Sequence, residues 1–273
     1  MDIKRVASAL LGFPLVVLIL TFGNKYVVDI FLMGIAILAM QEYFNAVQKE
    51  CKPVRWLGYL SCVFIGLIHI VPENIPSEAT KYILLLLIPT LMLLAFSQVI
   101  ITNMKTNFKD IAYTVFGILY IVTCISFIAL IRGMDKGVTI VWYAIIAAWG
   151  TDTFAYLIGK KFGKHKLSQV SPKKSVEGCI AGTVGAVLTA IIYTLAINNI
   201  YNLGISYLYI IVVTIILSLI GQIGDFAASS IKRYVNVKDY SNLIPGHGGM
   251  LDRIDSLMFL APFAYIFYTI GIF

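Results

Sequence analysis

Polar side chains suited to phosphate and metal chemistry crowd into one short stretch of this chain, residues 229–255. Cationic side chains bind phosphate oxygens, and carboxylate oxygens are the ligands that Mg²⁺ prefers. The stretch holds four cations, three carboxylates, one histidine and three glycines: Lys232, Arg233, Lys238, Arg253, Asp239, Asp252, Asp255, His247, Gly246, Gly248 and Gly249. This composition predicts a site that handles phosphate groups with a divalent metal, rather than a packed core.

Two more carboxylates stand near the ends of long apolar segments, Asp152 in Trp-Gly-Thr-Asp-Thr-Phe-Ala-Tyr and Asp225 in Gln-Ile-Gly-Asp-Phe. An ionised carboxylate is costly within a membrane, so it usually faces a polar cavity and has a partner. The alternative is a carboxylate that reaches the nearby water interface without a chemical role. Both aspartates are candidate metal-site residues.

Spacing predicts which residues share a helix face. If the helix of Asp225 continues beyond the membrane, Ser229, Lys232 and Arg233 follow it at i+4, i+7 and i+8 and lie on one side. That stripe would present a metal ligand, a hydroxyl and two phosphate-binding cations.

The last helix is expected to open with Asp252 and Asp255, an i, i+3 pair on either side of Arg253, just after the turn 246–249. Carboxylates at a helix N-terminus also act as caps, which is the alternative for Asp252. For His247 two roles stay open, a phosphate donor or a turn residue.

The loop that follows Asp152 is rich in lysine and serine. Ser171, Lys173, Lys174 and Ser175 would suit a triphosphate, with the lysines as point charges and the serines as hydrogen-bond donors. The same lysines could instead fix membrane topology and contact lipid headgroups.

Composition places these residues in a membrane protein. The 273 residues are 59% hydrophobic and 13% charged, with a mean hydropathy of +0.88, whereas about a quarter of a soluble domain is charged. The apolar runs are long enough for helices rather than barrel strands. We expect an all-α polytopic protein with about nine transmembrane helices, near 6–22, 26–46, 56–72, 82–101, 111–131, 138–158, 178–197, 205–227 and 255–272.

Basic residues orient this arrangement. With a cytoplasmic N-terminus, 17 of the 21 Lys and Arg residues fall on the cytoplasmic side, and Lys25, Lys81, Arg132 and Lys136 fall outside. Cytoplasmic loops carry such an excess of Lys and Arg. The net charge of +7 has two explanations, this topological bias alone or an added attraction for anionic lipids and nucleotide.

No linker divides the chain, so we expect a single membrane domain over 1–273. Within it, residues 1–137 would form scaffold and lipid-access helices, and residues 138–273 would form the catalytic helices and cytoplasmic loops. Gly178 and Gly182 make a small-xxx-small step, which favours close helix packing over a role in the site.

The stretch 229–255 resembles closely the signature of the phosphatidate cytidylyltransferases, or CDP-diacylglycerol synthases. That signature runs Ser-x-apolar-Lys-Arg, four residues, Lys-Asp, then a spacer to His-Gly-Gly-x-x-Asp-Arg-x-Asp, and every defined position is filled here. The segments around Asp152 and 171–178 are similar to the family's Asp-Thr-x-Ala-Tyr and Ser-Pro-Lys-Lys-Thr-x-Glu-Gly motifs. This chain departs from them at Phe154, Ser175 and Val176, where Gly, Thr and Trp are common.

The resemblance implies an enzyme that makes CDP-diacylglycerol and pyrophosphate from CTP and phosphatidate. One or two divalent ions, Mg²⁺ first, would be held by Asp225 and Asp252, with Asp152 and Asp255 as further ligands or orienting groups; an additional monovalent cation stays open. Phosphates would be bound by Lys173, Lys174, Lys232 and Arg233, and Arg253 would stabilise the pentacoordinate phosphorus. Ser171, Ser175, Ser229, Lys238 and His247 complete the expected substrate site.

The expected partners follow from that chemistry. They are CTP, phosphatidate and membrane lipids, with no nucleic acid, and a homodimer stays open. The expected location is the bacterial cell membrane, with the active site at the cytoplasmic face.

Two other functions would leave different patterns in the sequence. A CDP-alcohol phosphotransferase would carry an Asp-Gly-x-x-Ala-Arg motif with two later aspartates on one helix, and this pattern is absent from the sequence. A transporter or channel would place charges near mid-bilayer, between weakly polar loops. Here the charges gather at one face together with the polar loops, which favours the enzyme.

Overall fold

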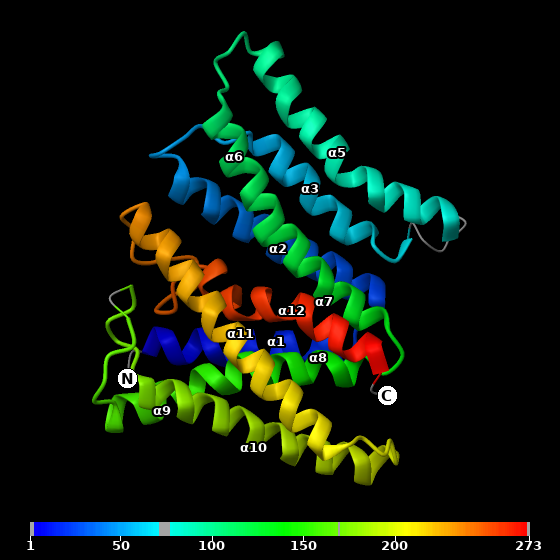
Figure 1. Ribbon diagram of the computed structural model, residues 1–273, viewed down its shortest axis with the longest axis vertical. Helices are drawn as coiled ribbons and strands as arrows, with labels where there is room; N and C mark the ends of the chain where they lie inside the picture. Colours follow the sequence, from blue (N-terminus) through cyan, green and yellow to red (C-terminus); the bar gives the residue numbers. More distant parts are fainter. Residues whose placement is uncertain (1–2, 71–76, 169, 272–273) are drawn as a thin grey trace. The chain divides into compact units, whose positions relative to one another are not determined.

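Long apolar runs can satisfy their backbone hydrogen bonds away from water only in helices or closed barrels. In the computed structural model of this chain they form helices (Figure 1). The structure describes residues 3–70, 77–168 and 170–271. Within these ranges the regular elements are helical and no strand occurs, so the expected all-α class is confirmed.

The helices coincide with the expected apolar segments. Their bounds are α1 (Ile3–Phe22), α2 (Lys25–Val47), α3 (Arg55–Leu67), α5 (Ser77–Ile101), α6 (Phe108–Gly117), α7 (Cys124–Gly133), α8 (Gly137–Ile145), α9 (Thr151–Phe162), α10 (Val176–Tyr201), α11 (Tyr207–Tyr234) and α12 (Leu251–Gly271). Short π-helical turns, η1 (Ile118–Thr123) and η2 (Ile146–Gly150), join α6 to α7 and α8 to α9. The ends of two expected segments, 71–72 and 272, lie outside the described residues.

Five helical stretches of the described chain are long and apolar enough to cross a membrane. They are Lys25–Val47, Phe108–Gly133, Gly137–Phe162, Val176–Tyr201 and Tyr207–Tyr234. Shorter apolar helices cover Gly12–Phe22, Arg55–Leu67 and Ile88–Ile101. The count of nine spans and the orientation of the N-terminus stay predictions.

The chain folds into two compact units. Unit 1 contains residues 1–133 and 235–253, and unit 2 contains residues 134–234 and 254–273. The segment 235–253, which holds the His-Gly-Gly turn, therefore packs with the N-terminal helices. The expected single domain, divided near residue 137, stays a prediction.

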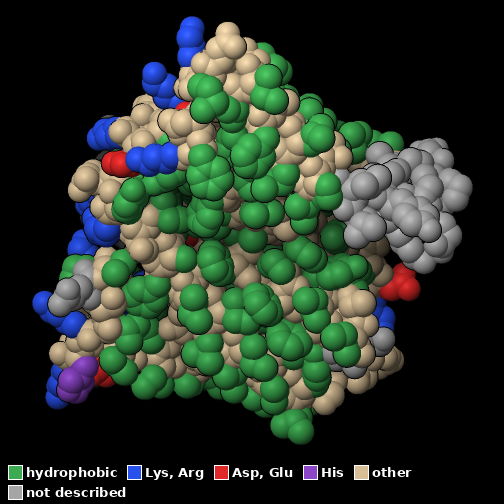
Figure 2. All heavy atoms as spheres, turned by 45° about the horizontal axis from the view of Figure 1, so that its top comes forward, with side chains coloured by type: hydrophobic (Ala, Val, Ile, Leu, Met, Phe, Trp, Pro, Cys, Tyr) green, Lys and Arg blue, Asp and Glu red, His purple; other side chains and the backbone are tan. Residues whose placement is uncertain are grey.

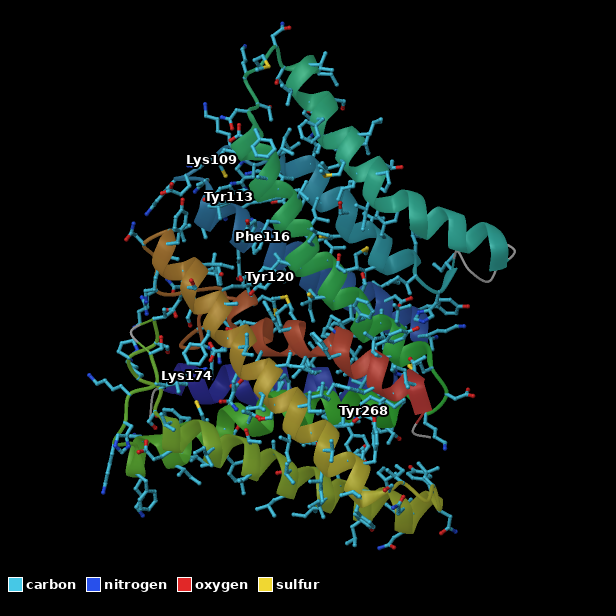
Figure 3. All side chains as sticks on the ribbon, viewed as in Figure 1. Lys109, Tyr113, Phe116, Tyr120, Lys174 and Tyr268 are labelled. Atoms are coloured by element: carbon cyan, nitrogen blue, oxygen red, sulfur yellow. The ribbon has the colours of Figure 1, made fainter. Side chains whose placement is uncertain are left out.

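Unit 1 is built around α2, which packs against α3 and α7. The ring of Tyr43 on α2 leaves no space for a side chain at Gly117, where an added Cβ would lie 2.5 Å from its Cε1 atom. Figure 3 labels Lys109, Tyr113, Phe116 and Tyr120 along α6 and η1. Phe116 stacks on Tyr120 with ring centroids 5.7 Å apart, so aromatic contacts tie this helix together.

In unit 2, α9 and α10 lie side by side (Figure 1). An added Cβ at Gly182 would lie 2.7 Å from the Thr151 carbonyl oxygen, and one at Gly178 would lie 2.9 Å from that of Ala155. Only glycine permits this approach, so the expected packing role of these glycines is confirmed.

The surface of these helices is largely apolar, and the face drawn in Figure 2 is covered mainly by hydrophobic side chains. On α10, large exposed apolar residues recur every three or four positions: Ile180, Val184, Leu188, Ile192 and Leu195. Such a stripe would be costly in water, and it fits a helix that faces lipid.

Candidate active site

Lys174 and Asp225 form an ion pair in unit 2 between Lys174 Nζ and Asp225 Oδ2. Lys174 comes from the loop that precedes α10, where Figure 3 labels it, and Asp225 comes from the last third of α11. The side chains of Lys174 and Asp225 keep 24% and 21% of their surface exposed, so the pair is half-buried and still accessible to solvent. The structure thus brings together two residues that the sequence predicted separately, Lys174 as a phosphate-binding residue and Asp225 as a metal ligand.

Two further carboxylates act on the same ammonium. Burial lowers the pKa of Lys174, while the negative charges of Asp152 and Asp255 oppose that shift and the positive charge of Lys232 adds to it. Three carboxylates from α9, α11 and α12 therefore share one cation. Concentrated charge of both signs in a partly buried place is typical of sites that bind charged ligands.

The loop that carries Lys174 folds back on itself. Leu167 N donates to Lys174 O at 3.0 Å, and Val176 N donates to His165 O at 3.0 Å. The Glu177 carboxylate accepts from the backbone of Lys164 at 3.1 Å and from His165 Nδ1 at 2.6 Å. These bonds hold the loop in a defined shape and so position Lys174.

Ser256 joins two of the aspartates. Its hydroxyl donates to Asp152 Oδ2 at 3.1 Å, and its backbone N–H donates to Asp255 Oδ1 at 2.8 Å. Ser256 is 2% exposed and Asp255 is 6% exposed. One buried serine therefore orients a carboxylate on α9 relative to one on α12, a role that the sequence did not reveal.

A buried polar network supports the start of α9, directly after the π-helical turn η2. Thr151 Oγ1 donates to Ser218 Oγ at 2.7 Å, and the hydroxyls of Ser218 and Thr183 lie 2.9 Å apart. Gln222 Nε2 donates to Thr183 Oγ1 at 3.0 Å. These bonds link α9, α10 and α11 beside Asp152, and sequence analysis missed them because isolated Thr and Ser residues are common in membrane helices.

The predicted stripe on α11 is confirmed as helical, because α11 continues without a break to Tyr234. Ser229 and Lys232 are half-buried, and Arg233 is exposed. Lys232 takes part in the electrostatics of Lys174, so the stripe contributes both Asp225 and a second cation to this cluster.

The His-Gly-Gly turn belongs to unit 1. Gly246, just before the motif, and Gly248, its first glycine, have φ of +77° and +83°, values that side chains rarely tolerate, so the turn requires glycine at both positions. Ile244 N donates to Gly248 O, and His247 N donates to Ile244 O, both at 2.9 Å. This tight turn places His247 half-buried, and whether it binds phosphate stays a prediction.

Asp252 lies in the first turn of α12 and is 9% exposed. Its Oδ2 atom accepts from Tyr240 N at 2.9 Å and from Gly249 N at 3.0 Å. It therefore caps the turn as well as the helix start, which is the structural alternative that its position at a helix N-terminus predicts. That Asp252 joins Asp225 as a metal ligand stays a prediction.

Glu42 on α2 is the main residue that sequence analysis missed. It is 5% exposed, and its carboxylate accepts from Ser241 Oγ at 2.6 Å, from Met250 N at 2.8 Å and from Leu251 N at 2.8 Å. A glutamate within an apolar run was a signal that could have found it, since intramembrane carboxylates usually have a defined partner.

The remaining predicted site residues differ in exposure. Lys173, Lys238 and Arg253 are exposed, and Ser171 is half-buried. Ser175 Oγ accepts from Gly178 N at 3.1 Å, so this hydroxyl caps α10. Their contacts with substrate stay predictions.

The oxygen donors of the candidate site are its aspartates. In the part of the chain that the structure describes, no three His, Cys, Asp or Glu side chains are grouped as metal ligands. Asp152, Asp225 and Asp255 instead all act on the Lys174 ammonium. Carboxylate oxygens are the donor type that Mg²⁺ takes, so these residues suit Mg²⁺ by donor type, and metal binding stays a prediction.

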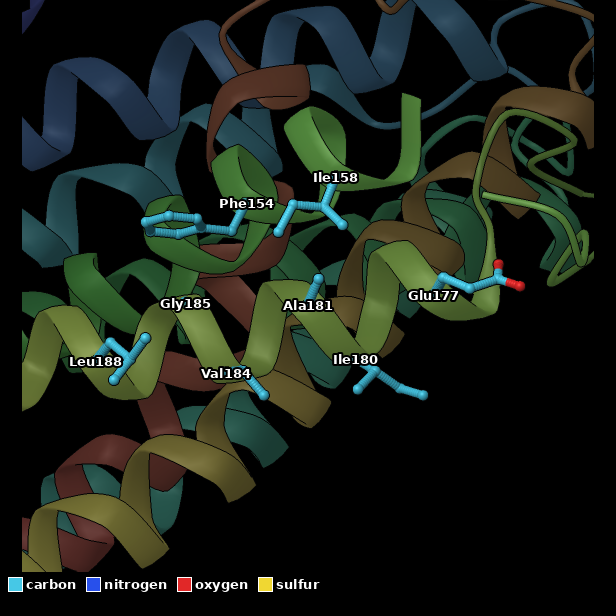
Figure 4. Close-up of a pocket in the computed structure, with 8 residues that line it drawn as sticks. All are labelled: Phe154, Ile158, Glu177, Ile180, Ala181, Val184, Gly185 and Leu188. Carbon is cyan, nitrogen blue, oxygen red and sulfur yellow. The ribbon is translucent and has the colours of Figure 1, made fainter. Parts of the chain in front are cut away.

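A groove of about 460 Å³ lies between α9 and α10 (Figure 4). Phe154 and Ile158 line it from α9, and Glu177 stands at one end. The Phe154 ring fills the space beside Gly185, where an added Cβ would lie 2.2 Å from its Cγ. This explains how the chain accommodates Phe154 at a position where the resembling family commonly has glycine.

Comparison with known proteins identifies the family of this chain. A family model described as "Cytidylyltransferase family" matches residues 3–271. The phosphatidate cytidylyltransferase of Bacillus subtilis (strain 168) is 33% identical over 267 residues, covering 96% of both chains. That of Staphylococcus aureus (strain COL) is 34% identical over 262 residues, covering 94% of this chain and 95% of the relative. This chain belongs to the cytidylyltransferase family.

Proposed function

We propose that this protein is a phosphatidate cytidylyltransferase. A phosphate oxygen of phosphatidate would attack the α-phosphorus of CTP, the bond between that phosphorus and the bridging oxygen would break, and pyrophosphate would leave with the electron pair. The observation that carries the proposal is the family match over residues 3–271. It is supported by relatives named phosphatidate cytidylyltransferase, which this chain matches over almost their whole length.

The reaction needs charge neutralisation more than a strong base, because the nucleophile is already an anion. Two polyanions must approach with the attacking oxygen in line with the leaving group. Lys174 and Lys232 already lie in one electrostatic cluster, where they would bind phosphate. Lys173, Arg233 and Lys238 are exposed and would bind the outer phosphates.

Polar side chains in the loop before α10, on α11 and in the His-Gly-Gly turn would orient the substrates. Ser171 and Ser175 in the loop, Ser229 on α11 and His247 in the turn would donate to phosphate oxygens. Arg253 would stabilise the charge that develops on the pentacoordinate phosphorus.

The metal site is part of the proposal. Asp225 and Asp252 would hold Mg²⁺, with Asp152 and Asp255 as further ligands or as groups that orient the first two. When bound there, one or two Mg²⁺ ions would offset phosphate charge. An additional monovalent cation would find oxygen donors in the same set.

We further propose nine membrane spans with a cytoplasmic N-terminus and a cytoplasmic active site in a bacterial cell membrane. The supporting observation is the bias of Lys and Arg, 17 of 21 on that side. Nucleotides occur in the cytoplasm, which agrees with this orientation.

The direct test uses protein purified in detergent and supplied with CTP, phosphatidate and Mg²⁺. We expect a cytidine lipid and pyrophosphate in equal amounts. Folded protein that leaves both substrates unchanged would refute the proposal. Protein that consumes CDP-diacylglycerol and an alcohol would instead indicate a CDP-alcohol phosphotransferase.

A further inference from the structure

Glu42 is a buried carboxylate whose partners all belong to the segment 241–251 of unit 1. Its Oε1 atom accepts from Ser241 Oγ and Met250 N, and its Oε2 atom accepts from Leu251 N. Three hydrogen bonds to one carboxylate offset the cost of burying its charge. The positive end of the α12 dipole adds to that stabilisation.

The space around Glu42 is closely filled. A Cβ added at Gly249 would lie 2.5 Å from Glu42 Oε2 and 2.7 Å from Oε1. The backbone after His247 is therefore pressed against this carboxylate. The second glycine of the His-Gly-Gly motif is explained by a contact to α2, far away in sequence.

Two carboxylates accept hydrogen bonds from the backbone of this segment. Glu42 binds the N–H groups of Met250 and Leu251, while Asp252 binds those of Gly249 and Tyr240. Three consecutive N–H groups directly before Asp252 are thus bound by these carboxylates, and that of Tyr240 is a fourth.

We propose that Glu42 is a positioning residue of the active site, which sets the start of α12 and through it the side chains of Asp252 and Arg253. This inference rests on the proposed function for the roles of those two residues. Glu42 would touch no substrate itself. A displacement of about 1 Å in reacting groups can cost about 100-fold in rate. This is the effect expected when the hydrogen bonds from Met250 and Leu251 to Glu42 are lost.

Glu42→Gln is the informative variant. A glutamine keeps the size, but it has one acceptor oxygen and an amide that donates. That amide would face an N–H of Met250 or Leu251, leaving a buried donor unsatisfied. The start of α12 should then shift or loosen.

The chain offers a matched control in Asp110. This residue is also a buried carboxylate in unit 1, 2% exposed, and it also caps a helix, accepting from Lys52 N at 2.6 Å and Asn107 N at 2.9 Å. Its helix is α6, which carries none of the predicted site residues. Asp110→Asn should cost stability in the same way, without touching α12.

The experiment measures kcat, Tm and hydrogen exchange for wild type and both variants in detergent. We expect both variants to lower Tm, but only E42Q to lower kcat, by about 100-fold. Only E42Q should speed hydrogen exchange in a peptide that covers 247–254. In an Arg253→Ala background, E42Q should add little to the loss, since groups that act as a unit are non-additive.

Several outcomes would overturn the inference. E42Q with the kcat of D110N would do so, as would unchanged exchange at 247–254 or full additivity with R253A. If E42Q does not accumulate in the membrane, Ser241→Ala removes only the hydroxyl donor and should lower kcat by about fivefold, the effect of about 1 kcal/mol. Wild-type kcat in S241A would then be decisive against it.

Failure of the proposed function can be told apart from failure of this inference. Wild-type protein without cytidylyltransferase activity would remove the proposed reaction. The exchange measurement does not depend on activity, and it would still report whether Glu42 holds residues 250 and 251.

Discussion

Lys174 Nζ and Asp225 Oδ2 form an ion pair that joins the loop before α10 to α11. The ammonium also lies 4.7 Å from the centroid of the Phe226 ring. Lys174 is therefore held by a charge and a ring from neighbouring positions of one helix. In the proposed reaction, a substrate phosphate that binds Lys174 would have to share this ammonium with Asp225.

Asp225→Asn tests the carboxylate, because it keeps the size and removes the charge. Asp225 is half-buried, so folding should be little affected. We expect a loss of at least about 100-fold in kcat, matching the several kcal/mol that metal-assisted charge stabilisation supplies. Asp252→Asn should lower kcat to a similar extent, but it should also lower Tm, because the buried Asp252 carboxylate accepts hydrogen bonds from Tyr240 N and Gly249 N. The double variant should have a kcat scarcely below that of either single one. Near-normal turnover of a single variant at saturating Mg²⁺ and CTP would withdraw that residue as a ligand.

Removal of divalent metal should abolish turnover. EDTA should stop cytidine-lipid formation, and added Mg²⁺ should restore it, because carboxylates and phosphates are both oxygen donors that this ion prefers. Turnover is measured by the release of pyrophosphate. Robust activity in excess chelator, or activity with another nucleotide but none with CTP, would contradict the prediction.

Ser256→Ala should lower activity through Asp152. The variant loses the 3.1 Å hydrogen bond to Asp152 and leaves the backbone bond to Asp255 in place. A lost bond of this kind is worth about 1 kcal/mol, or about fivefold. Ser61→Ala on α3 is the control, because Ser61 is also buried and, among the residues that the structure describes, its hydroxyl donates to the Leu57 carbonyl of its own helix. Equal kcat for both variants would remove the orienting role of Ser256.

Gly182→Ala should destabilise the contact of α9 with α10. The new methyl group would meet the Thr151 carbonyl oxygen at 2.7 Å, and overpacking typically costs about 1–3 kcal/mol. Thermal unfolding in detergent measures the loss. Gly34→Ala on α2 is the control, since a Cβ there has nothing within 4 Å and no loss of Tm is expected. A Tm for G182A equal to that of wild type would argue against close backbone packing.

Membrane topology can be tested by labelling single cysteines in a background without the native ones. Positions 165 and 240 should react from the cytoplasmic side and position 202 from outside, as the distribution of Lys and Arg predicts. Labelling of position 240 from outside would reject the orientation.

Much of this protein was predictable from local sequence alone. Apolar runs about 20 residues long predict helices. Helices α2 and α10 match their expected bounds to within about four residues, whereas α11 continues to Tyr234, beyond the expected end at 227. The Asp225 stripe followed from the period of a helix. The family followed from the motif in residues 229–255, because its residue types and spacing are fixed along one short piece of chain.

Other features depend on contacts between distant segments, which no local period encodes. Glu42 meets Leu251 at 2.8 Å across 209 positions, and Ser256 meets Asp152 across 104. Which faces of two helices meet is decided by how their side chains interdigitate, and this varies with every residue at the contact. The sequence by itself determined the helices, the family and the types of residue in the site. Only the tertiary structure decided that Lys174 pairs with Asp225, and that a helix expected to be scaffold holds the start of α12.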